Sequence, residues 1–211
     1  MPNWCSTEHA FFTENEDRSE LVKLHLAISS AMKTPSGTPN NFEPGWLFKI
    51  AEMHRIDPES VPCRGSITHL DELAPSSNHF KLSTETAWAP MAEMWDAVLE
   101  KYEGVFHVYT AEECGQEIYV NTDEEGLYFP NRYLLEIYGQ APMPEYWPGS
   151  KSHAGSFDIK EYFASFKEVK DYCEEVMGKT FYSLKKLKEY LSETFDNEDN
   201  ASAIAYKFTT E

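Results

Sequence analysis

The chain has 211 residues, 36 of them acidic and 18 basic, and its formal net charge at pH 7 is −18. A hydrophobic content of 41% with 14% aromatic residues is enough to bury a sizeable core, which excludes an intrinsically disordered chain. The acidic balance disfavours direct binding of nucleic acid through a basic groove, because phosphates would be repelled.

The sequence also argues against a membrane protein. No apolar run approaches the roughly 18 residues that span a bilayer, and the first residues lack the basic and apolar regions of a signal peptide. We therefore expect a cytoplasmic protein. Its four cysteines, Cys5, Cys63, Cys114 and Cys173, form no C-x-x-C pair. Their spacing predicts free thiols and no zinc or iron–sulfur cofactor.

Short strands alternate with amphipathic helices along the first part of the chain. Turn formers and β-rich runs predict strands at 3–12, 66–70, 80–86, 105–110 and 116–121. Hydrophobic periodicity predicts helices at 20–32 and 45–54 and a further helix beginning at Pro90. This order is typical of an α+β, ferredoxin-like split βαβ arrangement, with an antiparallel sheet covered on one face by helices and extended by one strand. A loop and helix at about 33–63 interrupt it as an insertion.

Three tryptophans are expected to pack in the core. The helix after Pro90 has an apolar stripe with Trp95 at its centre, so we expect this side chain between the helix and the sheet. Trp4 would anchor the first strand. Trp88 would close the corner between the strand at 80–86 and the helix, and burial of each would stabilise the fold by about 2–3 kcal/mol.

The C-terminal third is predicted to be a mainly helical extension. Apolar residues recur at helical spacing over 166–177, Gly178 can end that helix, and Ser183 can cap a second one. The two helices should form a hairpin, followed by a last strand at 203–209. We interpret 128–156 as a packed connection. The predicted domains are a ferredoxin-like domain over 1–137 and an extension over 138–211 that packs on it.

The motifs that carry common chemistries are missing or incomplete. Gly178-Lys179-Thr180 lacks the upstream glycine of a phosphate loop and follows a helix. Cys63 precedes Arg64, but the sequence fixes no base beside the thiol. The seven histidines show no metal-binding spacing. A site assembled across strands from His69, Asp71 and His107 remains open; otherwise the sequence favours a protein that is not an enzyme.

The negative charge is densest between residues 111 and 150, where eight acidic residues accompany one basic residue. The carboxylates that cluster around the strand at 105–110, its hairpin and the next turn should lie near one edge of the sheet. They form a candidate surface for a basic partner protein, and the alternative is that they only keep the protein soluble. These residues are Glu112, Glu113, Glu117, Asp123, Glu124 and Glu125.

Several stretches resemble the YubB ferredoxin-like domain family over about residues 1–137. They are the opening MPNWC, the corner TETAWAPM with the Trp-bearing helix after it, and the strand pair VFHVYTAEECGQEIYV. The resemblance implies a ferredoxin-like topology without an iron–sulfur cluster, in a protein of plasmids, phages and related mobile elements. Two stretches depart from the family pattern: Ser6-Thr7 follows Cys5 where the family has an Asn nearby, and SITHLDEL stands where the family has a Trp-containing strand. The family has no established function that could be transferred.

Three hypotheses follow for the function. The first is a non-enzymatic binding or accessory protein of a mobile element that acts through protein–protein contacts. The second is an acidic DNA mimic that inhibits a DNA-binding protein. The third is a small hydrolase, which requires a pocket that holds His69, Asp71 and His107 together.

Overall fold

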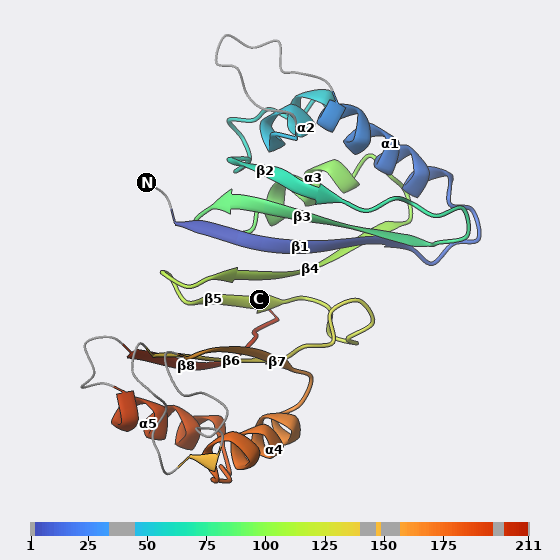
Figure 1. Ribbon diagram of the computed structural model, residues 1–211. Helices are drawn as coiled ribbons and strands as arrows, with labels where there is room; N and C mark the ends of the chain where they lie inside the picture. The colour runs from blue at the N-terminus through green and yellow to red at the C-terminus, as the bar shows by residue number, and fades with distance from the viewer. Residues whose placement is uncertain (1–2, 34–44, 140–146, 149–156, 196–200, 211) are drawn as a thin grey trace. The chain divides into compact units, whose positions relative to one another are not determined.

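The computed structural model describes residues 3–33, 45–139, 147–148, 157–195 and 201–210. In this part of the chain it shows an α+β protein with five helices and two antiparallel sheets (Figure 1). The chain divides into two compact units, residues 1–123 and residues 124–210.

The first unit contains a five-stranded sheet and three helices. Its strands have the order β2-β3-β1-β4-β5, and each pair of neighbours is antiparallel. The elements are β1 (Trp4–Thr13), α1 (Ser19–Lys33), α2 (Leu47–Met53), β2 (Gly65–Leu70), β3 (His79–Ala87), α3 (Ala92–Leu99), β4 (Val105–Glu113) and β5 (Ile118–Asn121). The sequence predicts one antiparallel hairpin from the strands at 66–70 and 80–86 and another from those at 105–110 and 116–121, and both are confirmed as β2–β3 and β4–β5.

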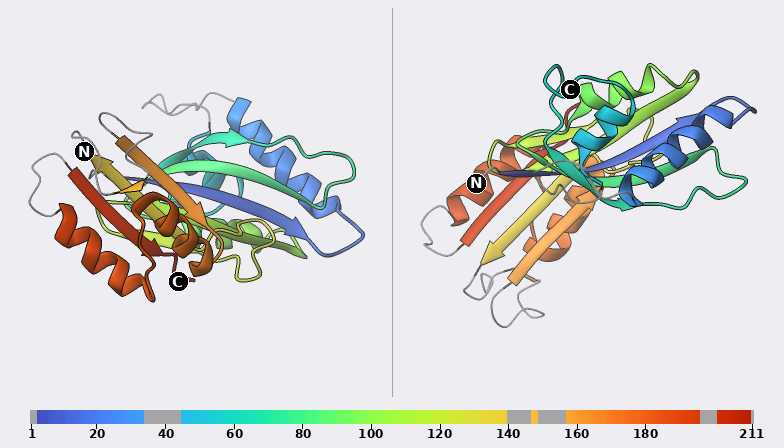
Figure 2. Two further views of the ribbon diagram at one scale, coloured as in Figure 1. Left: turned by 60° about the horizontal axis from the view of Figure 1, so that its bottom comes forward. Right: turned by 90° about the horizontal axis from the view of Figure 1, so that it is seen from above.

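Strand β1 is the centre of this sheet (Figure 2). Its Phe11 lies opposite Phe80 of β3 on one side and opposite His107 of β4 on the other. The chain passes from β1 through α1 and α2 to β2, with β3 between the two strands. It then passes from β3 through α3 to β4, with β1 between them. Each connection therefore spans a strand of opposite direction.

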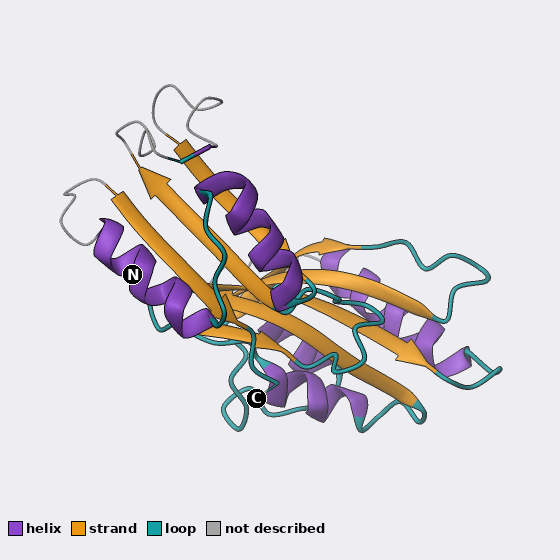
Figure 3. Cartoon of the chain, turned by 90° about the horizontal axis from the view of Figure 1, so that it is seen from below, coloured by secondary structure: helices purple, strands orange, loops and turns teal. Residues whose placement is uncertain are grey.

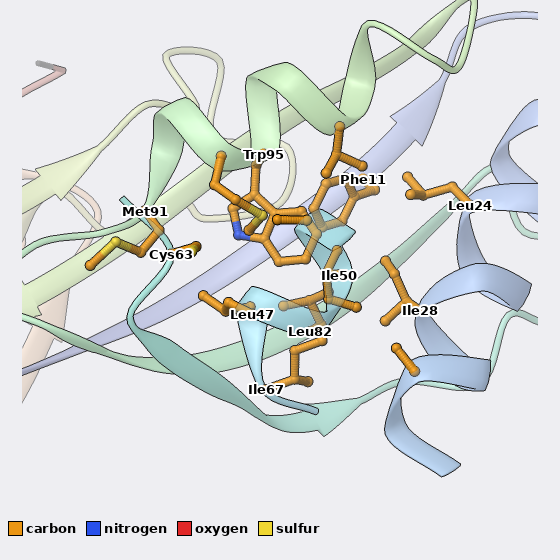
Figure 4. Close-up of a cluster of buried hydrophobic side chains, with 14 of the residues drawn as sticks. Phe11, Leu24, Ile28, Leu47, Ile50, Cys63, Ile67, Leu82, Met91 and Trp95 are labelled. Atoms are coloured by element: carbon orange, nitrogen blue, oxygen red, sulfur yellow. The ribbon is translucent and has the colours of Figure 1, made fainter. Parts of the chain in front are cut away.

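All three helices of the first unit cover the same face of the sheet (Figure 1). One buried cluster joins side chains from α1, α2 and α3 to Phe11, Phe80 and Leu82 of the strands (Figure 4). Four apolar residues recur along α1 at the helical spacing that predicts a helix over 20–32, and all four are fully buried: Leu21, Leu24, Ile28 and Ala31. The hydrophobic periodicity thus identified the buried face of this helix correctly.

The three tryptophans behave differently from one another. Trp95 is fully buried, as expected, but Trp4 is 49% and Trp88 is 44% exposed, so core packing of those two was a wrong prediction. Side chains alternate along β1, and because the buried Cys5 and Thr7 occupy the helix-covered face, Trp4 falls on the other one. Trp88 comes just after β3, with a positive φ of 68°.

The second unit contains a three-stranded sheet with two helices on one face (Figures 1 and 3). Its strands have the order β7-β6-β8, and both pairs are antiparallel. The elements are β6 (Tyr133–Gly139), β7 (Phe157–Phe163), α4 (Phe166–Met177), α5 (Leu184–Phe195) and β8 (Ala201–Lys207). A separate buried cluster joins α4 and α5 to the strands.

The division of the chain differs from the prediction. The second unit begins at Glu124, not after residue 137, because β6 pairs with β7 and β8. Strands β6 and β7 were not predicted, and β6 lies in the stretch interpreted as a connection. Leu134 and the next residue, Leu135, are both buried, so β6 lacks the alternation that identifies a half-exposed strand. The other part of that stretch lies mostly outside the described residues.

Capping residues define where the two predicted helices of the second unit begin or end. Ser165 caps α4, since its side chain accepts a hydrogen bond from the Glu168 N–H, and Gly178 ends the helix with a φ of 67°. The Ser183 hydroxyl accepts a hydrogen bond from the Lys186 N–H at the start of α5. These are the residue types that favour helix ends, which is why both helices could be predicted closely from the sequence.

None of the described helices has both the length and the apolar content needed to cross a bilayer.

Replacing Trp95 tests its role at the centre of the first core. Trp95→Ala should lower the free energy of unfolding by about 3–5 kcal/mol, because the cavity would lie where three helices meet the sheet. Trp95→Phe keeps a ring and loses no hydrogen bond, since the indole N–H has no partner, so its loss should be smaller. Urea unfolding followed by circular dichroism measures both, and an unchanged midpoint for Trp95→Ala would contradict this role.

Candidate functional site

Two of the six carboxylates predicted to face a partner are buried. Glu113 and Asp123 are each only 4% exposed, so the prediction that they contact a partner is wrong. The Glu113 carboxylate instead accepts hydrogen bonds from the N–H groups of Gly115, at 2.8 Å, and Gln116, at 2.6 Å. It therefore holds the turn between β4 and β5.

The other four carboxylates do not lie on one surface of a single unit. Glu117 is exposed in the β4–β5 turn, and Glu112 is half-buried on β4. Glu124 and Glu125 are exposed, but they belong to the second unit. Glu112 and Glu117 thus belong to the first unit, and Glu124 and Glu125 belong to the second.

The residues proposed for a hydrolase site are not brought together. His69 Nε2 lies 3.1 Å from Asp71 Oδ1, and both side chains are exposed at the edge strand β2. His107 lies on β4, and both β3 and β1 separate it from β2. The alternating pattern of a strand places His69 and Asp71 on one face, in agreement with their contact, but the structure does not assemble them with His107.

His107 instead belongs to a row of polar side chains on the helix-covered face of the three central strands, here called the polar strip. Its Nε2 atom lies 2.8 Å from Nδ1 of His9, and Nε2 of His9 lies 3.0 Å from Oγ1 of Thr84. His9 is fully buried and Thr84 nearly so. The polar strip consists of Cys5, Thr7 and His9 on β1, Thr84 and Thr86 on β3, and His107 and Tyr109 on β4.

Aromatic rings enclose the two imidazoles. The His107 ring stacks on Phe11, with centroids 4.7 Å apart, and on Tyr109, with centroids 5.4 Å apart. The His9 ring lies 5.5 Å from that of Trp95. The polar strip is therefore continuous with the apolar core.

This environment keeps the polar strip uncharged at neutral pH. Burial, and then the proximity of His107, holds the pKa of His9 well below its ordinary value. Burial lowers the pKa of His107 to about 3. Burial also raises the pKa values of the Cys5 thiol and the Tyr109 hydroxyl, which keeps both protonated.

The polar strip is better suited to stability than to proton transfer. Both ring nitrogens of the buried His9 are already engaged by protein groups, so this histidine is not a free base. Among the described residues, no group of three His, Cys, Asp or Glu side chains is placed to hold a metal ion. Sequence patterns did not identify His9 or Thr84 as members of a site. The alternation of side chains along β1 does place Cys5, Thr7 and His9 on one face of that strand.

The first unit has a pocket of about 370 Å³ at the start of α3. Three segments form it: the loop before β2, the end of β3 with the corner that follows, and the first residues of α3. Most of the lining is apolar, with one cation and one carboxylate. The lining residues are Pro62, Cys63, Arg64, Ala87, Trp88, Ala89, Pro90, Met91, Ala92 and Glu93.

Hydrogen bonds from several segments fix Trp88 at the side of this pocket. Its N–H donates to the Asn3 carbonyl, and the N–H of Ala87 donates to the Arg64 carbonyl, both at 2.9 Å. The Thr86 hydroxyl donates to the Ala89 carbonyl at 2.7 Å. The Arg64 guanidinium lies 5.2 Å from the centroid of the Trp88 ring, within the range of a cation–π contact.

Cys63 is part of this pocket but is not activated. The residue is 8% exposed, and burial raises the pKa of its thiol above the ordinary value. A nucleophilic cysteine needs the opposite shift. This environment agrees with the sequence, which fixes no base beside the thiol, and Arg64 is a lining residue of the same pocket.

Glu113 and Glu117 provide a matched test of buried and exposed carboxylates in one turn. Glu113→Gln should lower the free energy of unfolding by about 1–2 kcal/mol, because a neutral amide replaces a charged acceptor of two backbone N–H groups. Glu117→Gln should change it by less than about 0.5 kcal/mol. Equal unfolding midpoints for the two variants in urea would show that Glu113 does not hold the turn.

The polar strip should make stability depend on pH. The unfolded histidines take up protons near pH 6.5, while the folded pair resists protonation, so stability is greatest above pH 6.5 and falls as the pH is lowered. Between pH 7.5 and pH 5.5, His107 should contribute a loss of about 1 kcal/mol.

Denaturant titrations at several pH values can isolate this contribution. His107→Gln should flatten the dependence between pH 5.5 and pH 7.5, whatever its effect on stability itself. His69→Gln is the control, because His69 is exposed, and it should leave the dependence unchanged. Equal stability of the wild-type protein at pH 5.5 and pH 7.5 would contradict the assignment of His9 and His107 as histidines that stay neutral in the folded state.

Comparison with models of protein families, with curated proteins and with solved structures finds no match for this chain.

Proposed function

We propose that the chain is a non-enzymatic binding protein, which recognises a segment of a partner protein at the pocket beside Trp88. The observation that carries this proposal is the exposure of Trp88 at a φ of 68° on the wall of a 370 Å³ pocket. A bulky side chain at positive φ is rare and strained, and it persists only where its surroundings fix it.

The surroundings of Trp88 suit a prepared binding surface. The backbone of the corner is held by Asn3 and Arg64, which come from two other segments of the chain. The ring is therefore kept near the surface at little further cost in conformational entropy on binding. Tryptophan and arginine are the residue types that most often dominate the energy of protein interfaces.

For the first unit we propose a ferredoxin-like arrangement and kinship with the YubB domain family. The strand order β2-β3-β1-β4-β5 supports the ferredoxin-like arrangement, because each helical connection passes over one antiparallel strand. Two of the stretches that carry the resemblance also meet in the structure: Trp4 of the first pairs with Ala87 of the second, and the Trp88 N–H donates to the Asn3 carbonyl. An accessory role in a mobile element follows from that kinship.

The partner is proposed to be a protein with a basic surface. A net charge of −18 favours encounters with positively charged proteins and disfavours nucleic acid. The long-range electrostatic field depends on the net charge of the whole chain. The preference for positively charged partners therefore does not require the six carboxylates to form one surface. Specific recognition is assigned to the pocket.

Trp88 and Trp4 allow a matched test. Both side chains are partly exposed, but only Trp88 lines the pocket. Peptides selected from a random library on the wild-type protein should bind Trp88→Ala at least about thirtyfold more weakly, as expected for a hot spot of about 2 kcal/mol. Their affinity for Trp4→Ala should change less than about twofold. Calorimetric titration measures both, and equal affinity for wild type and Trp88→Ala would move the binding surface elsewhere.

A further inference from the structure

Free backbone donors lie in the first turn of α3, where Glu93 lines the pocket. The cap residue Met91 makes no side-chain capping bond, and the first helical bond joins the Trp95 N–H to the Met91 carbonyl. Among the described residues, the N–H groups of Glu93 and Met94 have no acceptor. Such donors at the first turn of a helix attract a negatively charged group.

A second, independent observation points to a missing acceptor. The Trp95 indole N–H is fully buried and has no hydrogen-bond partner. Its nitrogen faces the side of the core where Cys63 and Met91 lie (Figure 4), and both of these residues line the pocket. A buried donor without a partner is uncommon in a folded protein and needs an explanation.

Arg64 adds a positive charge to the same pocket, whose remaining walls are mainly apolar. The guanidinium is exposed and rests beside the Trp88 ring, and no described carboxylate lies within ion-pair distance of it. An arginine and helical N–H groups suit a carboxylate, while Pro62, Trp88 and Pro90 suit an apolar side chain.

We infer that the pocket captures the C-terminal carboxylate of a partner polypeptide that ends in an apolar residue. The carboxylate would accept hydrogen bonds from Arg64 and from the first turn of α3, and the last side chain would lie against Trp88. A volume of 370 Å³ is at the small end of the range for ligand sites, which suits the end of a chain better than a long segment. The inference rests on the proposed binding role of the pocket.

Glu93 gives the inference a further consequence. Glu93 also lines the pocket, and its negative charge would repel a bound carboxylate. Removing this charge should therefore strengthen the binding of an acid and leave the binding of its neutral amide unchanged.

Three synthetic probes test the inference: acetyl-Lys-Gly-Gly-Phe with a free carboxylate, the same peptide as its C-terminal amide, and acetyl-phenylalanine. The free peptide should bind at least about tenfold more tightly than its amide. Arg64→Gln should remove most of that difference, while Arg55→Gln, which removes an exposed charge outside the pocket, should not. Glu93→Gln should raise the affinity for the acid alone.

Heteronuclear NMR shows where the probes bind. The amide resonances of Glu93 and Met94 should shift on addition of the free peptide, together with the Trp95 indole resonance, which is identified by its loss in Trp95→Phe. Shifts confined to other residues would overturn the inference.

The outcomes separate this inference from the proposed function. If the acid and the amide bind equally and Trp88→Ala weakens both, the pocket is a binding site but not a carboxylate site. If acetyl-phenylalanine binds as tightly as the peptide, the pocket takes small acids and the polypeptide source is wrong. Failure of the free peptide to bind overturns the inference. The proposed binding role is decided separately, by the affinities of the library-selected peptides for the wild-type protein and for Trp88→Ala.

Discussion

Burial of Trp95 is the constraint on which the first unit depends. Its ring makes an edge contact with Phe11 of the central strand, with centroids 5.1 Å apart, and also lies near His9. The cluster around it includes side chains from all three helices. A large aromatic side chain at this point fixes the position of α3 on the sheet, because close-packed cores tolerate little displacement.

The position of α3 determines what the neighbouring segments can do. The helix begins directly after the corner that holds Trp88. The exposed Trp88 ring and the buried Trp95 ring therefore belong to one short, continuous segment of the chain. Packing places the N-terminal end of α3 beside Arg64, and this proximity creates the pocket. One side of α3 therefore stabilises the domain, while its first turn is left with donors that the protein itself does not use.

The polar strip shows how the same core accommodates polar groups on the central strands. The His9 and His107 imidazoles satisfy one another and Thr84, and burial keeps both neutral. Because buried polar groups are tolerated only when they are hydrogen-bonded, this arrangement also fixes the register of β1 between β3 and β4. Among the described carboxylates, Glu113 and Asp123 are buried, and Glu113 holds the turn that follows it.

Local patterns in the sequence determined the α+β class, the α1, α4 and α5 helices, their buried faces and the two hairpins of the first unit. These features depend on periodicity and on capping residues within a few positions, which are readable without a partner element. The tertiary structure alone decided that β6 and β7 belong to a second sheet, that Trp4 and Trp88 are exposed, and that His107 meets His9 rather than His69. It also decided that Glu113 and Asp123 are buried and that Arg64 and Trp88 share a pocket. Most of these outcomes depend on contacts between residues far apart in the sequence, such as strand pairing, which local patterns do not specify.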